Sequence, residues 1–328
     1  MRTRRLTQRL APVSAPSQRG RTLIELLIAM VLSLMIVAAV GALYDVTSRS
    51  SRNSEQLGSA EERGRLAMFF LGEPIALAAY GNINSADFNR TRFQANSFQG
   101  PHLRACTNGR FQNPAAGDFT CVASASPGDH LHVSYQAESV TSAPQGLAAM
   151  TDCLGQNAPL VGGVPIVANA YSVEPAPSGV LEFSCLGNGG VAAVGLVRDV
   201  EDFKVYFAFD PNSHAQADFG GAPHTIRPTS LLTATQINAL PGSADAPEAV
   251  GNPWNHVVAV YVCVLLRTAE AGTTPDGISR FRPCPQNEVE AATGTLEVQA
   301  NDGIARRSFT QVFTVRTRSQ ARAGSQAQ

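Results

Sequence analysis

The feature that most constrains this chain is a long apolar segment near its N-terminus. From Leu23 to Tyr44 it carries a single charged residue, Glu25. A helix needs about 20 apolar residues to cross the hydrocarbon core of a membrane, so the segment has the length of a transmembrane helix. A charge at the centre of such a span costs about 2.5–3.5 kcal/mol. Glu25 is therefore predicted either to tilt toward water at the interface or to gain a partner later.

The residues around Glu25 resemble the N-terminus of type IV pilins. In that family a short basic leader ends in Gly, and the apolar span carries Glu at its fifth position. Here Gly20 ends the leader, Arg21 would be the first residue of the mature chain, and Glu25 is the fifth. The run from Thr22 to Leu26 matches the family signature, whereas Arg21 stands where the family usually has Phe. The resemblance implies cleavage after Gly20 by a prepilin peptidase.

Two other kinds of N-terminal segment remain open. A secretory signal peptide has an apolar region of about 7–15 residues and a small-residue cleavage site, and this span is longer and lacks a clear Ala-x-Ala site. An ordinary signal anchor would explain the length but not Gly20 or Glu25. Under either interpretation, the positive-inside rule keeps the acid-free leader in the cytoplasm and places residues 45 onward outside. Its arginines are Arg2, Arg4, Arg5, Arg9 and Arg19.

Charge and cysteine content limit the kinds of protein that the exported part, from residue 45 onward, can be. The net charge of −1 includes the leader arginines, and without them 20 basic residues face 26 acidic ones. This balance argues against a nucleic-acid-binding surface. An even number of cysteines in an oxidising compartment indicates disulfides. Fifteen pairings are open, and we favour the sequential one, in which each bond closes about 15–33 residues and contributes roughly 3 kcal/mol. The cysteines are Cys106, Cys121, Cys153, Cys185, Cys263 and Cys284.

Helical periodicity continues beyond the apolar span. We expect a transmembrane and filament helix over residues 21–56 and a second helical segment over residues 57–81. Gly58 and Gly64 should loosen a joint near residues 57–64, since each costs about 1 kcal/mol relative to Ala. Pro74 should kink or split the second segment. The apolar stripe expected to pack on the core consists of Leu66, Phe69, Phe70 and Leu77.

From residue 82 the pattern changes to turn residues and short alternating segments. This predicts a β-rich head over residues 82–318, followed by a disordered tail over residues 319–328. The segments 82–128 and 136–180 are expected to hold long loops. A short helix should span Thr233 to Leu240, capped by Thr233 or Thr235. Strands are expected at residues 129–135, 179–185, 200–209, 257–266 and 307–318, the fourth of them buried on both faces because it is almost continuously apolar.

Several of these segments resemble the PilW family of minor pilins. The resemblance implies an α+β, type IV pilin-like fold, with a long N-terminal transmembrane and filament helix and a C-terminal antiparallel β-sheet head with disulfides. It also implies a role in initiating pilus assembly, at or near the pilus tip, with other minor pilins, the major pilin, the prepilin peptidase and the inner membrane as partners. J-type pseudopilins of type II secretion share this plan. The matching segments are Arg65 to Leu71 with Ala79 to Gly81, Val200 to Phe203, Trp254 to Val260 with Leu266 and Arg267, and Arg306 to Thr310.

No set of residues in the sequence forms an evident active site. Nucleophile-elbow, phosphate-loop and zinc-helix motifs are missing, so we predict neither an enzyme nor a cofactor or metal site. His130 and His132 share a strand face, but no third ligand is evident. The segment from Asp210 to Asp218 lacks the glycine and closing glutamate of a calcium loop. Lys204, the single lysine against 24 arginines, suggests no mechanism by itself.

By the resemblance, Glu25 pairs with the N-terminal amine of a neighbouring subunit and fixes the register of assembly. A charge-assisted partner would offset the penalty on a buried carboxylate. Small residues in the span let helices approach each other, namely Ala29, Ala38, Ala39, Gly41 and Ala42. A membrane-tethered adhesin or binding module, whose long loops hold a ligand, is the alternative from another class of protein.

Overall fold

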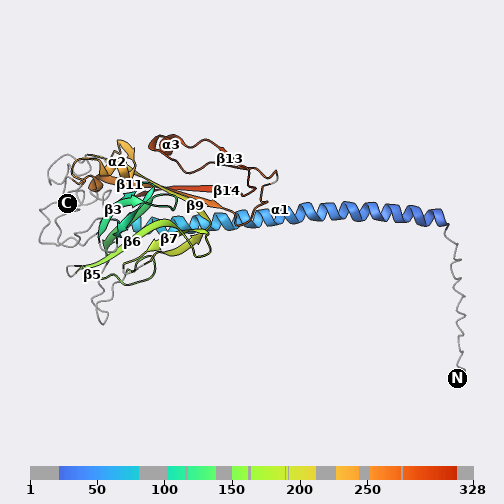
Figure 1. The fold of residues 1–328 in the computed structure, drawn as a ribbon, viewed down its shortest axis with the longest axis horizontal. Helices are drawn as coiled ribbons and strands as arrows, with labels where there is room; N and C mark the ends of the chain where they lie inside the picture. The colour runs from blue at the N-terminus through green and yellow to red at the C-terminus, as the bar shows by residue number, and fades with distance from the viewer. Residues whose placement is uncertain are drawn as a thin grey trace, which may run out of the picture. The chain divides into compact units, whose positions relative to one another are not determined.

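The structure is a computed structural model. It describes residues 22–80, 102–114, 117–137, 150–161, 164–188, 190, 192–211, 227–243, 252–274 and 276–315. The chain divides into two compact units, Met1–Arg52 and Asn53–Gln328, and each is described by itself. The boundary between them falls within one helix, α1, which spans Leu23–Leu77 (Figure 1). Gly20, Arg21 and the expected tail over residues 319–328 lie outside the described residues.

Helix α1 is not interrupted where the sequence predicts a joint. It continues through Gly58, Gly64 and Pro74, so the alternative that Pro74 splits the helix is wrong. The looser joint near residues 57–64 and a kink at Pro74 stay predictions. Pro74 has no N–H to donate to the carbonyl of Phe70. The hydroxyl of Tyr171, in the head, donates to that carbonyl at 3.0 Å. The head therefore supplies the hydrogen bond that the proline removes.

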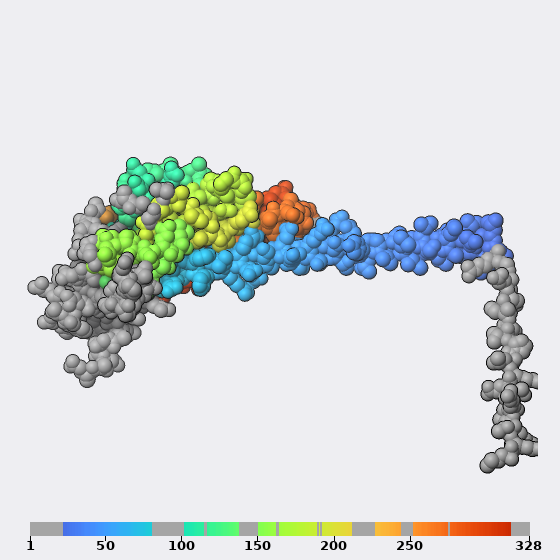
Figure 2. All heavy atoms as spheres, turned by 90° about the horizontal axis from the view of Figure 1, so that it is seen from below, coloured from blue at the N-terminus to red at the C-terminus, as the bar shows by residue number. Residues whose placement is uncertain are grey.

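The face of α1 that packs on the head differs from the predicted stripe. Leu66 and Phe69 are 41% and 72% exposed, whereas Phe70 and Leu77 are partly buried against the core. Small residues on α1 let the head pack closely against the helix. The rings of Phe309 and Phe313 lie directly over Gly64 and Gly72, where larger side chains would clash. Figure 2 shows the cyan part of α1 lying along the green and yellow strands of the head. The buried residues of this face are Ala60, Gly64, Ala67, Met68, Leu71, Pro74 and Ile75.

The head contains two larger antiparallel sheets. The six-stranded sheet has the order β1-β4-β6-β7-β8, with β5 paired to β6, and the four-stranded sheet has the order β10-β9-β11-β14. The first consists of β1 (Leu103–Cys106), β4 (His130–Gln136), β5 (Leu160–Val161), β6 (Val164–Pro175), β7 (Leu181–Leu186) and β8 (Val194–Arg198). The second consists of β9 (Val200–Phe209), β10 (Ser230–Leu232), β11 (Val257–Arg267) and β14 (Arg306–Thr314).

Two hairpins and three short helices complete the described part of the head. The hairpins pair β2 (Gly109–Asn113) with β3 (Asp118–Ala123), and β12 (Ser279–Phe281) with β13 (Val298–Ala300). The helices are α2 (Ala234–Asn238), the 3-10 helix η3 (Pro253–His256) and α3 (Glu288–Thr293).

The five predicted strands correspond to β4, β7, β9, β11 and β14, and the burial of β11 on both faces is confirmed. Thr233 caps α2 as predicted and forms a capping box with Gln236. The expectation of long loops over 82–128 and 136–180 is wrong for their described parts. These parts contain β1, β2 and β3, and β5 and β6.

One hydrophobic core joins the C-terminal part of α1 to both sheets. Aromatic rings cross from sheet to sheet within it. The rings of Tyr171 and Phe183 lie 5.6 Å apart, and those of Phe183 and Phe203 lie 5.3 Å apart edge to face. Such pairs are worth about 0.5–1.5 kcal/mol beyond the area they bury. The two sheets therefore share their packing instead of forming separate domains.

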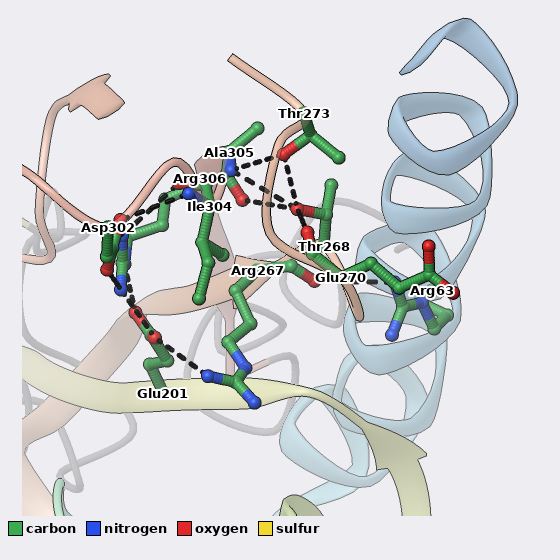
Figure 3. Close-up of polar contacts among 10 residues, drawn as sticks. All are labelled: Arg63, Glu201, Arg267, Thr268, Glu270, Thr273, Asp302, Ile304, Ala305 and Arg306. Atoms are coloured by element: carbon green, nitrogen blue, oxygen red, sulfur yellow. Dashed lines mark hydrogen bonds and ion pairs between the residues drawn. The ribbon is translucent and has the colours of Figure 1, made fainter. Parts of the chain in front are cut away.

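A polar network lies where α1 meets the base of the head (Figure 3). Arg63 of α1 forms an ion pair with Asp199 and donates to the carbonyls of Arg198 and Arg267 at 3.1 and 3.4 Å. Beside it, Arg306 of β14 donates to Glu201 of β9 at 3.0 Å. Side chains from α1, β9 and β14 thus contribute to one polar region.

The structure forms the sequential set of disulfides that the sequence favours. Cys106 of β1 bonds to Cys121 of β3, Cys153 to Cys185 of β7, and Cys263 of β11 to Cys284. Their Cα–Cα distances of 5.6, 6.5 and 5.6 Å lie within the range of ordinary disulfides. None of the three joins the six-stranded sheet to the four-stranded sheet.

Candidate assembly site on the N-terminal helix

The candidate site is the N-terminal part of α1, within the first unit. Its apolar side chains are exposed along the whole span, from Leu23 at 79% to Tyr44 at 74%. The helix is long and apolar enough to cross a membrane, and its most apolar stretch has no buried residue. An exposed apolar surface of this length requires either lipid or other helices as its surroundings.

Glu25 lies in the first turn of this helix. Its backbone N–H donates to the carbonyl of Thr22 at 3.1 Å, and the N–H of Leu26 reaches the same carbonyl at 3.3 Å. A carboxylate in this position is favoured by the partial positive charge of the helix N-terminus. Among residues 22–80, none forms an ion pair with Glu25, and its side chain is exposed. The carboxylate is thus available to a cation that comes from outside the described chain.

The small residues of the span leave room for a neighbouring helix. Ala29, Ala38, Ala39 and Ala42 are exposed, and a side chain added at Gly41 would meet nothing within 4 Å. In lipid, such small residues permit close packing between helices. The same exposed apolar surface is suited to contact lipid in the membrane and other helices in a filament.

The histidine pair does not form a metal site with any described residue. His130 accepts a hydrogen bond at Nδ1 from the backbone N–H of Phe111 at 3.1 Å, and its ring lies 4.6 Å from that of Phe111. The ring of His132 lies 4.5 Å from that of Phe119. Both histidines are buried by the β2–β3 hairpin, and no cluster of three or more candidate metal ligands occurs in the described chain. Most of the segment from Asp210 to Asp218 lies outside the described residues.

Sequence reasoning missed two features of the head. It treated Gly64 as a weak point of the helix, whereas Gly64 is where Phe309 packs against α1. It also assigned no role to Lys204, which is buried in β9 between two carboxylates, Asp129 and Asp202. The one available signal for the second feature was the scarcity of lysine itself.

Two family models match this chain, one at its N-terminus and one in its head. A family described as prokaryotic N-terminal methylation motif matches residues 16–41, and one described as type IV pilus-assembly protein W, PilW, matches residues 170–317. A solved structure, a type IV-like pilin from Thermus thermophilus, is 12% identical, with a TM-score of 0.36, over 78% of this chain and 94% of its own. No curated protein matches the chain.

A methylation motif at the start of a long apolar helix, followed by an antiparallel β head with disulfides, defines a type IV pilin-like protein. Residues 170–317 of this protein are in addition similar to the type IV pilus-assembly protein W family. That domain covers β7 to β14 and part of β6, whereas β1 to β5 lie before it.

Proposed function

We propose that this protein is a minor pilin that helps to initiate type IV pilus assembly and is incorporated at or near the pilus tip. Its work would be assembly and not catalysis. The observation that carries the proposal is the exposed apolar helix of the methylation motif, with Glu25 as the single charge of its span. The PilW domain supports a role in a pilus in preference to a J-type pseudopilin of type II secretion.

Processing supplies the partner that Glu25 requires. Cleavage after Gly20 by a prepilin peptidase would give Arg21 a free α-amino group, the site of N-methylation. In the apolar core of a filament, an unpartnered carboxylate is strongly disfavoured. A charge-assisted contact between Glu25 and the amine of a neighbouring subunit offsets that penalty in one axial position only. The carboxylate thereby selects the register in which the other minor pilins and the major pilin join.

The place of action follows from the same segment. The five leader arginines would hold residues 1–20 in the cytoplasm, because positively charged flanks remain on that side of the inner membrane. The head would then fold in the periplasm, where the three disulfides can form. After assembly the whole mature chain would be part of the extracellular pilus.

The decisive experiment compares Glu25→Ala with Glu55→Ala, which removes an exposed carboxylate of the same helix outside the apolar span. We expect both variants to reach the membrane, and mass spectrometry with N-terminal sequencing to show both starting at Arg21. Surface pili should be lost with Glu25→Ala and retained with Glu55→Ala. Gly20→Val should abolish processing and piliation together.

Other outcomes would contradict the proposal. Normal piliation with Glu25→Ala would show that the carboxylate does not set the register. If a strain that lacks this protein kept its pili but lost protein secretion, the protein would be a J-type pseudopilin instead. Intact pili with lost surface attachment would identify a tethered adhesin. A mature chain that does not start at Arg21 would show that the apolar segment is an ordinary signal anchor and not a prepilin N-terminus.

A further inference from the structure

Lys204 is the single lysine of the chain, and its side chain is buried in the head. It is 3% exposed on β9, while every other permanently basic side chain is an arginine. Arginine is usually the better residue for a buried ion pair, because its guanidinium donates in a rigid fork and is weakly hydrated. What lysine offers instead is an amine that becomes a nucleophile once it loses a proton.

An amide and two carboxylates surround the amine of Lys204. Its Nζ is in close contact with the side-chain oxygen Oδ1 of Asn108, in the turn between β1 and β2. Oδ1 of Asp129 lies 3.8 Å from Nζ, and Oδ1 of Asp202 lies 3.9 Å from it. Asn108 has a φ of 49°, a left-handed conformation that Asn tolerates better than most residues. The turn therefore holds the Asn108 amide against the amine.

Asp129 fixes the backbone beside both Asn108 and Lys204. One carboxylate oxygen accepts the backbone N–H of Asn108 at 2.9 Å, and the other accepts the N–H of Val205, next to Lys204, at 2.9 Å. Asp129 is 3% exposed. Burial raises its pKa to about 6, against the opposing effects of Lys204 and the two N–H donors. A carboxyl with a pKa near neutral is suited to accept and return a proton.

We propose that Lys204 and Asn108 become joined by an intramolecular isopeptide bond. Asp129 takes the proton that the ammonium of Lys204 must lose. The Nζ lone pair then attacks Cγ of Asn108, and the carbonyl π electrons move to Oδ1. As the carbonyl re-forms, the Cγ–Nδ2 bond breaks and Nδ2 leaves as ammonia with a proton from the attacking nitrogen.

Asp129 finally returns its proton, so the leaving group departs as ammonium. One C–N bond forms and one breaks, nothing is oxidised or reduced, and no cofactor takes part. The product is a secondary amide between β9 and the β1–β2 turn, with Asp129 as the acid–base group and Asp202 as the second carboxylate against Nζ.

The bond would connect parts of the head that the disulfides leave unconnected. It would join β9 of the four-stranded sheet to the turn after β1 of the six-stranded sheet, across 96 residues of sequence. Each disulfide, by contrast, closes a shorter loop. An amide link also survives reduction of the disulfides, so the two sheets would stay joined in a reducing medium.

The test is peptide mapping of the full-length protein extracted from membranes, then reduced, alkylated, denatured and digested with trypsin. Without the bond, trypsin cleaves after Lys204 and releases the peptide from Ala105 to Arg110 that contains Asn108. With the bond, we expect no cleavage after Lys204. The Ala105–Arg110 peptide should instead be attached to the peptide that begins at Asp199, with a mass deficit of about 17 Da, the mass of ammonia.

Two variants complete the test, and neither needs to fold for the digest to be read. Lys204→Arg keeps the positive charge beside Asp129 but should release the Ala105–Arg110 peptide. Asn108→Ala should restore cleavage after Lys204. The proposal is overturned if wild-type protein gives a free, cleavable Lys204, whether Asn108 is recovered intact or deamidated to Asp. That result would leave an ion pair and a hydrogen bond only.

Discussion

Among single residues, His130 shows how burial determines the chemistry of a side chain. It shares a strand face with His132, but the sequence offers the pair no third metal ligand. Its ring is packed against Phe111, and Nδ1 accepts that residue's backbone N–H. Nδ1 is therefore an acceptor, and the neutral imidazole carries its proton on Nε2. Burial lowers the pKa of His130 to about 4, and Arg110 adds to the shift. The ring is thus held neutral across the physiological range.

This predicts a stability that depends on pH. Because the folded pKa lies below the ordinary value of 6.5, the unfolded chain binds a proton in this window that the folded chain does not. Stability should fall as the pH drops from about 6.5 to about 4, by at most about 3 kcal/mol. His130→Phe keeps an aromatic ring and should flatten this part of the profile.

Urea unfolding of both proteins at several pH values between 4 and 7.5 measures the effect. Asp129, whose raised pKa gives the opposite slope over part of this range, is present in both proteins, so the difference between the two profiles isolates His130. Parallel profiles would show that the imidazole titrates normally in the folded protein.

At the scale of elements, the packing of α1 on the head depends on residues that lack large side chains. A Cβ at Gly64 would lie 2.5 Å from the ring of Phe309, whereas a Cβ at Gly58 would meet nothing within 4 Å. The two glycines lie in one helix and differ mainly in whether β14 packs over them. They therefore form a matched pair for measuring the helix–sheet contact.

Gly58→Ala should stabilise the protein by up to about 1 kcal/mol, because alanine is the better helix former and the added methyl meets open space. Gly64→Ala has the same helix propensity gain but should be destabilising by about 1–3 kcal/mol, because the Phe309 ring must move. Chemical denaturation gives both values. Adding Phe309→Leu should recover part of the loss. Equal stabilisation by both alanines would show that the ring yields freely.

The strands and helix α1 show which parts of the fold could be predicted from the sequence and which could not. Apolar patterns identified β4, β7, β9, β11 and β14. The pattern is an alternation in β4, β7 and β14, and an almost continuous apolar run in β11. The sequence predicted the packed face of α1 only in part, because large apolar residues such as Leu66 and Phe69 dominate a count of apolar periodicity, whereas Gly64 adds nothing to it. The sequence also did not show that the helix continues through Pro74, since the residue that compensates for the proline is Tyr171, about a hundred residues away.

The same limit applies to the two sites. The N-terminal site is a local motif, and its residues could all be named from consecutive sequence. The cluster around Lys204 consists of residues from the β1–β2 turn, from the position just before β4, and from β9. These segments are far apart in the sequence and meet only through long-range strand pairing. No spacing rule connects Asn108 with Lys204. Cysteine pairing was the intermediate case, because nearby cysteines made the sequential set reasonable without excluding the other pairings.

At the scale of the whole head, one arginine connects its three main parts. Arg63 of α1 pairs with Asp199, which separates β8 of one sheet from β9 of the other, and donates to a carbonyl of β8 and one of β11. The side chains of the pair are 20% and 12% exposed. A charge left alone in such a place is destabilising. The ion pair therefore affects the attachment of the helix to both sheets at once.

Arg63→Met should lower the free energy of unfolding by about 2–4 kcal/mol, somewhat less than for a fully buried pair, since Asp199 and two carbonyls lose their donor. Arg65→Met is the matched control two residues away. Arg65 is exposed, and within the described part of the chain its one ion pair is with Glu61 at 3.5 Å, so its loss should change stability by less than about 0.5 kcal/mol. Urea unfolding of the full chain in detergent provides both numbers.

The double variant Arg63→Met, Asp199→Asn separates the ion pair from the packing of the arginine stem. If the charge of Asp199 causes most of the loss, neutralising it should recover about 1–3 kcal/mol, as expected for two residues in direct contact. Additive losses would instead mean that the guanidinium acts mainly through the carbonyls of Arg198 and Arg267. In that case Arg63→Lys, which keeps the charge but not the fork of donors, should be nearly as destabilising as Arg63→Met.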